Sequence, residues 1–182
     1  MRAIVVYESM YGNTHAVAIN IAAGLRATHE VTLVPVTRAT PELAAAADLI
    51  VAGCPTHMHR MPTAASRRAA AEAARKQGSG LTVDPDADGP GLRAWLEGIS
   101  AENVLAASFD TRLSGISAFT GRASRNISRL LTRHGCRLIV PPESFLVSRQ
   151  NVLLKGESAR ANSWGELVGG AARAASTVST RP

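Results

Sequence analysis

The chain has 182 residues, of which 46% are hydrophobic and 19% charged, a composition typical of one globular domain with its own core. No run approaches the ~20 apolar residues that a membrane helix requires, and the first apolar run is too short for a secretory signal, so we expect a cytoplasmic protein without a membrane span. The net charge of +6 attracts anionic partners. The aromatic content of 4% and the lack of a nucleic-acid-binding motif argue against nucleic acid. An acidic protein is therefore the partner to consider.

The chain opens with an apolar run at residues 2–8, which predicts a strand buried on both faces. A helix is predicted at 14–27 from the i, i+4, i+8 apolar repeat that starts at Val17. The turn between them directs free backbone N–H groups and the positive end of the helix dipole at one point, which suits a phosphate. This turn, residues 9–14, contains no lysine and does not match the loop that binds nucleoside triphosphates.

Further elements follow from apolar runs, helical periodicity and end signals. The other strands are predicted at 31–36, 48–53, 104–109 and 138–140. The other helices are predicted from Pro41 onward with Thr40 as the N-cap, and at 63–77, 92–99, 119–134 and 157–175. Pro141-Pro142 interrupts the last strand, and residues 145–147 either resume it or form a turn extension.

The helix periodicities also predict which side chains face the core. Helix 92–99 is expected to bury Leu92, Trp95, Leu96 and Ile99, and helix 157–175 to bury Trp164, Leu167, Val168 and Ala171. Residues 78–90 are rich in Gly, Ser, Pro and Asp and are expected to form a surface loop. We expect a single domain over residues 1–175 and a disordered tail at 176–182.

Strands that alternate with helices predict an α/β fold with a parallel sheet and right-handed crossovers. Because the strands are apolar on both faces, helices should cover each side, giving a three-layer, doubly wound, five-stranded sheet. Ligands of such sheets bind beyond the carboxyl ends of the strands. The loops that should form the site are therefore 9–14, 54–62 and 110–118.

These three loops resemble those of the flavodoxin-like family. Ser9-Met10-Tyr11-Gly12-Asn13-Thr14 resembles the phosphate loop of that family, with Tyr11 in place of the usual middle hydroxyl residue. Gly53-Cys54-Pro55-Thr56-His57 resembles the second loop, and Phe109-Asp110-Thr111-Arg112 resembles the third loop of small actinobacterial-type members. Pro141-Pro142-Glu143-Ser144-Phe145 also looks like that subgroup, and the resemblance extends from residue 2 to about Ala172.

The resemblance implies the strand order 2-1-3-4-5, a single non-covalently bound FMN and electron transfer, either as a carrier or as an oxidoreductase acting on a quinone or a porphyrinogen. The expected partner is a redox protein or a small-molecule electron acceptor. The resemblance places the FMN phosphate on the first loop, comprising Ser9, Met10, Tyr11, Gly12, Asn13 and Thr14. It places Pro55, Thr56, His57 and Met58 on one side of the flavin ring. On the other side it places Asp110, Thr111, Arg112, Leu113, Ser114 and Gly115.

The chain departs from acidic, electron-carrying members of the family in charge and in aromatic content. Neither inner loop carries Tyr or Trp, so either His57, Met58, Trp95 or Phe119 takes the place of an aromatic residue, or the flavin is bound more openly or with weak affinity. Positive charge near the flavin stabilises its reduced anion, so Arg60 and Arg112 predict a less reducing flavin.

Several single residues have two interpretations. His57 is expected beside the flavin, for stacking or proton delivery, whereas His59 is expected to be an exposed loop residue. Asp110 is expected to orient a loop or cap the following turn, and Ser9 could instead act as a plain N-cap. Arg122, Arg125, Arg129 and Arg133 share one helix face, which is expected to be solvated unless it docks an acidic partner.

One rival function is catalytic. Cys54 and Arg60 form a C-x5-R pattern, which in cysteine phosphatases provides a thiolate nucleophile and a phosphate-binding Arg, with Asp110 as a conceivable general acid. Pro55 lacks an N–H and His57 is bulky, which disfavours a phosphate-cradling loop here. Cys54 and Cys136 are instead expected to be free thiols, since two cysteines make neither a disulfide framework nor a metal motif.

The sequence also contains partial matches to a calcium loop and to a receiver domain. Asp84, Asp86, Asp88 and Gly89 mimic the start of a calcium loop, but position twelve is Trp95 rather than Glu, so we expect a flexible acidic loop. A receiver domain would need an Asp where Gly53 and Cys54 stand. A flavodoxin-shaped module that has lost its cofactor and binds partners through its basic helix is a third class of function beside the redox protein and the phosphatase.

Overall fold

The computed structural model describes residues 1–116 and 120–179 and contains one parallel sheet. Its strand order is β2-β1-β3-β4-β5, with β6 paired to β4 beside β5. The strands are β1 (Arg2–Tyr7), β2 (Glu30–Pro35), β3 (Leu49–Pro55), β4 (Leu105–Leu113), β5 (Arg137–Leu138) and β6 (Glu143–Val147). The predicted α/β fold with order 2-1-3-4-5 is therefore confirmed.

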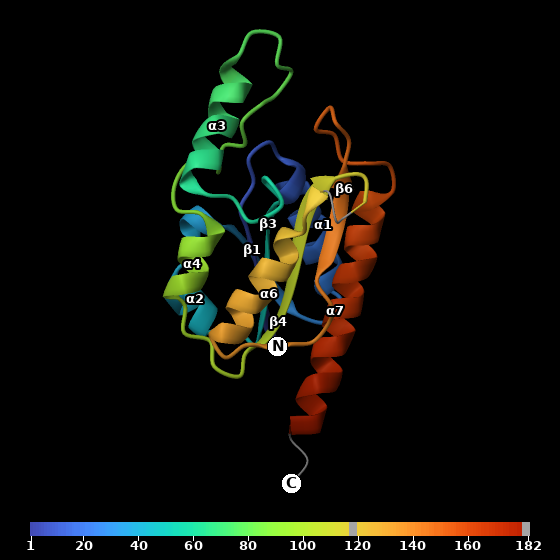
Figure 1. Ribbon diagram of the computed structural model, residues 1–182. Helices are drawn as coiled ribbons and strands as arrows, with labels where there is room; N and C mark the ends of the chain where they lie inside the picture. Colours follow the sequence, from blue (N-terminus) through green and yellow to red (C-terminus); the bar gives the residue numbers. More distant parts are fainter. Residues whose placement is uncertain (117–119, 180–182) are drawn as a thin grey trace.

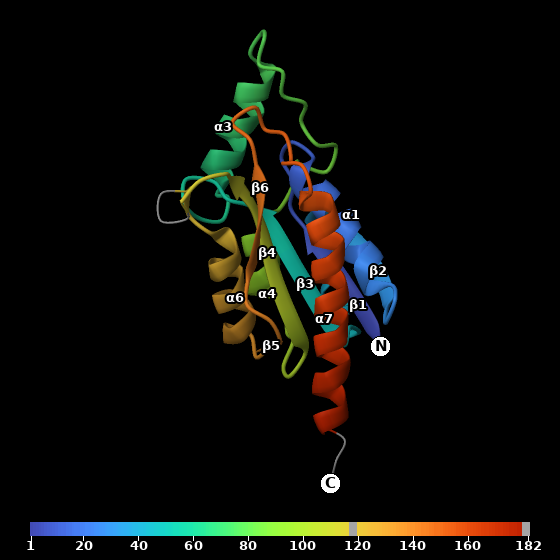
Figure 2. The ribbon, with the colours of Figure 1, turned by 90° about the vertical axis from the view of Figure 1, so that its right-hand side faces the viewer.

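Helices cover both faces of the sheet. They are α1 (Asn13–Leu25), α2 (Pro41–Ala45), α3 (Ala64–Arg75), α4 (Leu92–Gly98), α6 (Ala123–Arg133) and α7 (Glu157–Ser179), with a 3-10 turn at Val36–Arg38. Figures 1 and 2 show α1 and α7 on one face and α4 and α6 on the other. Helix α3 extends beyond the carboxyl ends of the strands and buries no residue, so it borders the site and not the core (Figure 1). Within the described ranges, no helix is both long enough and apolar enough to cross a bilayer.

The strands supply a core on each face through the period-two alternation of their side chains. In β1, Ile4 and Val6 join the core beneath α4 and α6, whereas Ala3 and Val5 join the core beneath α1 and α7. The predicted inward residues of α4 (Leu92, Trp95, Leu96 and Ile99) are all buried. The N-cap prediction for α2 is also confirmed, because the Thr40 hydroxyl accepts a hydrogen bond from Leu43 N at 3.4 Å.

The fifth strand is divided into two parts, as the Pro141-Pro142 pair predicts. β5 pairs with the first half of β4 at Leu105 and Ala106, and β6 pairs with its second half from Phe109 to Leu113. Because β6 supplies this second edge, β4 continues past the predicted end at Phe109 as far as Leu113. The start of the predicted third loop is thus strand, and its residues have fixed directions.

The C-terminal helix differs from the prediction in two ways. Leu167 was expected to be buried but is 56% exposed, because α7 packs on α1 and the sheet through Ala161, Trp164, Val168 and Ala172. The helix also continues to Ser179, past its predicted end at Ala175, and residues 180–182 of the expected tail lie outside the described residues. The predicted start of helix 119–134 moves to Ala123, and Phe119 too lies outside the described residues.

Glycines allow α1 and α7 to approach closely. A Cβ on Gly165 would overlap the Ile21 carbonyl oxygen of α1, and a Cβ on Gly24 would overlap the Asn162 carbonyl oxygen of α7. The neighbouring Gly170 faces open space. The contact between the two helices therefore depends on the missing side chain at particular positions.

We expect Gly165→Ala to destabilise the fold by about 1–3 kcal/mol, because the added methyl must push α7 away from α1. Gly170→Ala is the matched control in the same helix and should be neutral or stabilising by about 0.5–1 kcal/mol, because Ala favours helix. Urea unfolding of both variants measures the difference. Equal midpoints would show that the interface between the two helices accommodates the methyl group.

Candidate functional site

The first turn of α1 is built to receive an anion. Gly12 is its N-cap, with φ of 89°, and a side chain there would meet nothing within 4 Å. Within the described residues, the backbone N–H groups of Asn13, Thr14 and His15 have no hydrogen-bond acceptor. Free N–H groups at the positive end of a helix dipole form an anion cradle, as the sequence of this turn predicts.

Ser9 holds the backbone of this cradle in place. Its side chain is buried, and its hydroxyl oxygen accepts a hydrogen bond from Gly12 N at 3.1 Å. The hydroxyl thus closes the turn much as an N-cap residue would, and fixes the left-handed Gly12. It does not itself line the cavity described below.

Two hydroxyl groups join the first and third loops. Thr14 Oγ1 lies 2.7 Å from Thr111 Oγ1, and both side chains are buried. Thr111 also accepts a hydrogen bond at its carbonyl oxygen from Thr56 N at 2.8 Å. The three loops are therefore connected through one residue of β4.

Two other residues of the first loop contact distant elements. The Tyr11 hydroxyl donates to the Ala70 carbonyl oxygen of α3 at 2.8 Å, and the Asn13 side-chain amide donates to the Asn151 carbonyl oxygen at 2.9 Å. Tyr11 therefore connects the cradle to α3, and Asn13 connects it to the turn after β6.

The second loop starts with a strained turn. Two reciprocal backbone hydrogen bonds link His57 and Arg60, and the two residues between them, Met58 and His59, have φ of 47° and 72°. Positive φ at both central positions defines a type I′ turn, which normally uses Asn or Gly. The backbone of Gly121 lies against His59 so closely that any side chain at Gly121 would overlap it, so this packing holds the turn.

His57 faces inward from this turn and His59 outward. The His57 ring lies 3.3 Å (Nδ1 to Oγ) from Ser66 of α3. Burial, with a smaller contribution from the Arg67 charge, lowers the pKa of His57, so the ring is neutral at pH 7. A neutral ring at this place suits contact with an uncharged aromatic surface better than ion pairing.

Asp110 lies beneath the site. Its side chain is fully buried, and Oδ2 accepts a hydrogen bond from Ser124 N in the first turn of α6 at 2.7 Å. Burial raises the pKa of Asp110, while the bonds from Ser124 oppose that rise. The role as a cap for the next helix, expected from the sequence, is the one the geometry shows.

Arg112 holds the third loop. Its Nη1 donates to the carbonyl oxygens of Leu113 and Gly115 at 3.1 and 3.0 Å and to the Thr120 hydroxyl at 2.8 Å. These bonds fold residues 113–116 around the guanidinium group. The positive charge thereby stays fixed at the edge of the site.

The three loops enclose a cavity of about 160 Å³ at the carboxyl ends of β1, β3 and β4. Its lining residues are Met10, Tyr11, Asn13, Thr14, Pro55, Thr56, His57, Thr111, Arg112, Leu113, Val147 and Asn151. The expected residues Ser9, Gly12, Met58, Asp110, Ser114 and Gly115 do not line it. Ser9 and Asp110 support it from below, and Met58 borders a neighbouring cavity of about 340 Å³ beside α3.

Sequence patterns did not indicate Val147 and Asn151. Both lie where β6 ends and turns back, with Val147 bridged to Leu153 and Asn151 at φ of 58°. Asn tolerates positive φ, so the polar run Ser148-Arg149-Gln150-Asn151 marks a turn. Nothing local in that run shows that it returns to the first loop.

Exposed apolar side chains lie on the loops that line the cavity and on the turn after β6. Met58 is 82% exposed, Leu113 49%, Ile116 69% and Val152 60%. One comes from the second loop, two from the third and one from the turn after β6. Exposed apolar side chains on loops that belong to one site favour an apolar ligand or partner there.

The phosphatase hypothesis fails at its nucleophile. Cys54 is completely buried in the core, and burial, together with the Glu8 and Asp110 carboxylates, raises the pKa of its thiol well above the usual range. A reactive cysteine needs access and a lowered pKa. Cys136 is likewise buried, and burial raises its pKa to about 11.

Comparison with known families shows to which protein family the chain belongs. The family model described as Flavodoxin matches residues 5–139, which is most of the chain. The chain belongs to the flavodoxin family. Membership of this family implies FMN as the cofactor and an electron-transfer fold, and the free N–H groups of the cradle fit the phosphate of FMN.

Solved structures agree on the fold. A flavodoxin from the domain Archaea is 17% identical, with a TM-score of 0.65 over 95% of this chain and 99% of that one. Flavodoxin 1 from Bacillus cereus is 16% identical, with a TM-score of 0.63 over 92% and 97%. A flavodoxin, WrbA-like protein from Agrobacterium tumefaciens is 21% identical, with a TM-score of 0.59 over 94% and 97%. None of the curated proteins matches the sequence.

The raised pKa of Asp110 gives a stability prediction. A carboxyl whose folded pKa lies above its unfolded value stabilises the fold most at low pH, and this contribution is lost as pH rises through the folded pKa. Asp110→Asn keeps an oxygen for Ser124 N without the charge. The variant should therefore gain stability relative to the native protein as the pH rises from 4 to 7, because Asn has no charge to bury.

Urea unfolding at several pH values measures this difference. Glu97→Gln, at an exposed position of α4, is the control for a change of one charge. A difference between Asp110→Asn and the native protein that stays constant with pH would contradict the assignment.

Proposed function

We propose that the cavity between the three loops binds FMN and that the protein transfers electrons through it. The free N–H groups of Asn13, Thr14 and His15 carry this proposal, because they provide a phosphate site that nothing else in the described chain uses. Ser9, Tyr11, Gly12 and Thr14 complete the phosphate loop. Bound FMN would supply one-electron and two-electron transfer, and the protein sets its affinity, exposure and potential.

The flavin ring would lie between the second and third loops. Pro55, Thr56 and His57 line one side of the cavity, and Thr111, Arg112 and Leu113 line the other. Asp110 acts as a positioning residue that caps α6, while Met58, Ser114 and Gly115 belong to the second and third loops on either side. The cavity of about 160 Å³ is smaller than the ~300 Å³ at which ligand sites begin, so the ring would stay partly open to solvent.

An open ring favours direct exchange of electrons with a partner. The protein would serve as a carrier or as an oxidoreductase whose other substrate is a quinone, a porphyrinogen or a redox protein. Arg125 and Arg129 are exposed on α6, close in sequence to the third loop, and favour a partner with an acidic surface. We place this function in the cytoplasm, where buried free thiols such as Cys54 stay reduced.

Thr14→Val tests the phosphate site. The variant removes a hydroxyl at the cradle while keeping the shape of the side chain, and should weaken FMN binding about 10- to 100-fold, the cost of a hydrogen bond to a charged group. Riboflavin, which has the same ring without the phosphate, should bind both proteins equally. Titration monitored by flavin fluorescence gives both dissociation constants.

Thr132→Val, at an exposed position of α6, is the control and should bind FMN as the native protein does. Equal loss of FMN and riboflavin affinity in Thr14→Val would show that the change acts through the fold and not through the phosphate. A native protein that binds neither compound would favour the cofactor-less module.

Arg112 should raise the reduction potential of bound FMN, because its fixed positive charge stabilises the reduced anion. Arg112→Gln should lower the potential by about 60 mV, the equivalent of ~1.4 kcal/mol for one electron. Arg129→Gln is the control, since it removes the same charge from an exposed position of α6. Potentiometric titration with equal potentials for Arg112→Gln and Arg129→Gln would contradict a local effect.

A further inference from the structure

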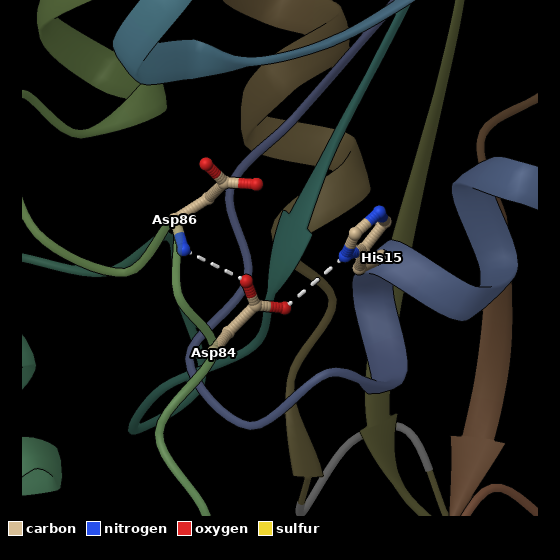
Figure 3. Close-up of side chains that lie close together, drawn as sticks. All are labelled: His15, Asp84 and Asp86. Atoms are coloured by element: carbon tan, nitrogen blue, oxygen red, sulfur yellow. Dashed lines mark hydrogen bonds and ion pairs between the residues drawn. The ribbon is translucent and has the colours of Figure 1, made fainter.

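Three side chains with metal-binding atoms converge beside the anion cradle (Figure 3). His15 belongs to the first turn of α1, and Asp84 and Asp86 belong to the long loop between α3 and α4. One ligand atom from each lies within 4.8 Å of the other two. The loop that the sequence predicts to be flexible and acidic is thus packed against the core at two of its carboxylates.

Asp84 is a buried carboxylate whose Oδ2 faces the His15 ring. Its side chain is 1% exposed, and Oδ1 accepts a hydrogen bond from Asp86 N at 3.0 Å. The polar contact of Oδ2 in the described chain is with His15 Nδ1 at 3.5 Å, beyond the usual hydrogen-bond range of 2.7–3.2 Å. A buried carboxylate needs a positive charge or donors close to it, and the His15 ring supplies a charge only when it is protonated.

The distance of 3.5 Å between His15 Nδ1 and Asp84 Oδ2 fits two atoms that bind the same metal ion. Zinc binds imidazole nitrogen and carboxylate oxygen at about 2.0–2.2 Å in tetrahedral geometry, which places the two ligand atoms ~3.4 Å apart. His15 Nδ1 and Asp84 Oδ2 are already near this distance. Figure 3 shows the ring nitrogen and the carboxylate oxygen facing each other.

Surrounding residues hold the ligands in place. The Tyr7 ring stacks on the His15 ring with centroids 4.5 Å apart, and its hydroxyl donates to Asp86 Oδ2 at 3.2 Å. Asp84 N donates to the Met10 carbonyl oxygen at 2.8 Å, which fixes the loop. Such outer contacts orient ligands in metal sites. Arg38, 3.7 Å from Asp86 Oδ1, has a 70% exposed side chain and is free to turn into solvent.

We propose that His15, Asp84 and Asp86 bind a divalent transition metal ion, with zinc as the best match. One imidazole and two carboxylates suit Zn²⁺ and Mn²⁺, whereas Ca²⁺ takes six to eight oxygen ligands. His15 is 33% exposed and Asp86 23%, so water reaches the remaining coordination position. The ion neutralises Asp84 and joins the loop to α1.

Titration of the metal-free, FMN-free protein with Zn²⁺, followed by calorimetry, tests the site. The native protein should bind one ion per chain, and His15→Gln and Asp86→Asn should each weaken binding by at least about tenfold. Asp88→Asn is the matched control, because Asp88 is an exposed carboxylate of the same loop outside the cluster. It should bind as the native protein does.

Co²⁺ in place of Zn²⁺ gives a second readout, a visible absorption band that reports low coordination number and should disappear in His15→Gln. Circular dichroism of each variant shows whether it is folded. Lack of saturable binding up to about 1 mM Zn²⁺, or equal binding by His15→Gln and Asp88→Asn, would overturn the proposal. Because FMN is absent throughout, either result leaves the proposed electron-transfer function unaffected.

Discussion

The first turn of α1 is the constraint on which the rest of the site depends. Its free N–H groups are polar, fixed in direction and aligned with the helix dipole, so the most favourable partner is a dianion. The turn can stay open because Gly12 adopts a left-handed conformation and the buried Ser9 hydroxyl accepts its N–H. Hydrogen bonds from Tyr11, Asn13 and Thr14 to neighbouring elements then hold the turn in place.

Rigidity comes from bonds between the loops and not only within them. Thr111 contacts Thr14 through its side chain and Thr56 through its carbonyl oxygen, while the Thr56 hydroxyl accepts from Ala123 N at the start of α6. Thr111 of β4 therefore connects the three loops, and Thr56 connects them to the start of α6. Because these bonds are made within the protein itself, they leave little ordering for a ligand to impose, and preorganisation of this kind raises affinity.

Local patterns in the sequence predicted the strands, most of the helices and the three loops, because apolar period and turn residues act over a few positions, whereas the strand order came from the resemblance of the loops to a known family. They did not predict Asn151 at the site or the exposure of Leu167, since each depends on which distant surface an element meets. The same limit explains Asp84. The residues next to Asp84 in the sequence are polar and typical of turns, which predicts an exposed side chain. Asp84 is nevertheless buried, because Met10 and His15, which are distant in the sequence, lie against it.

The two ends of the site differ in the kind of interaction they offer. The cradle presents backbone N–H groups that suit a charged group, whereas the loops beside it carry the exposed apolar side chains of Met58, Leu113 and Val152. A flat ring that covers these side chains would bury apolar area without the two flanking aromatic residues of acidic carriers. Aliphatic contacts lack the additional attraction of stacked rings, so the phosphate has to supply a larger share of the affinity. In the proposed complex, the fixed charge of Arg112 would lie beside the ring, and the edge of the ring would stay accessible to an electron acceptor.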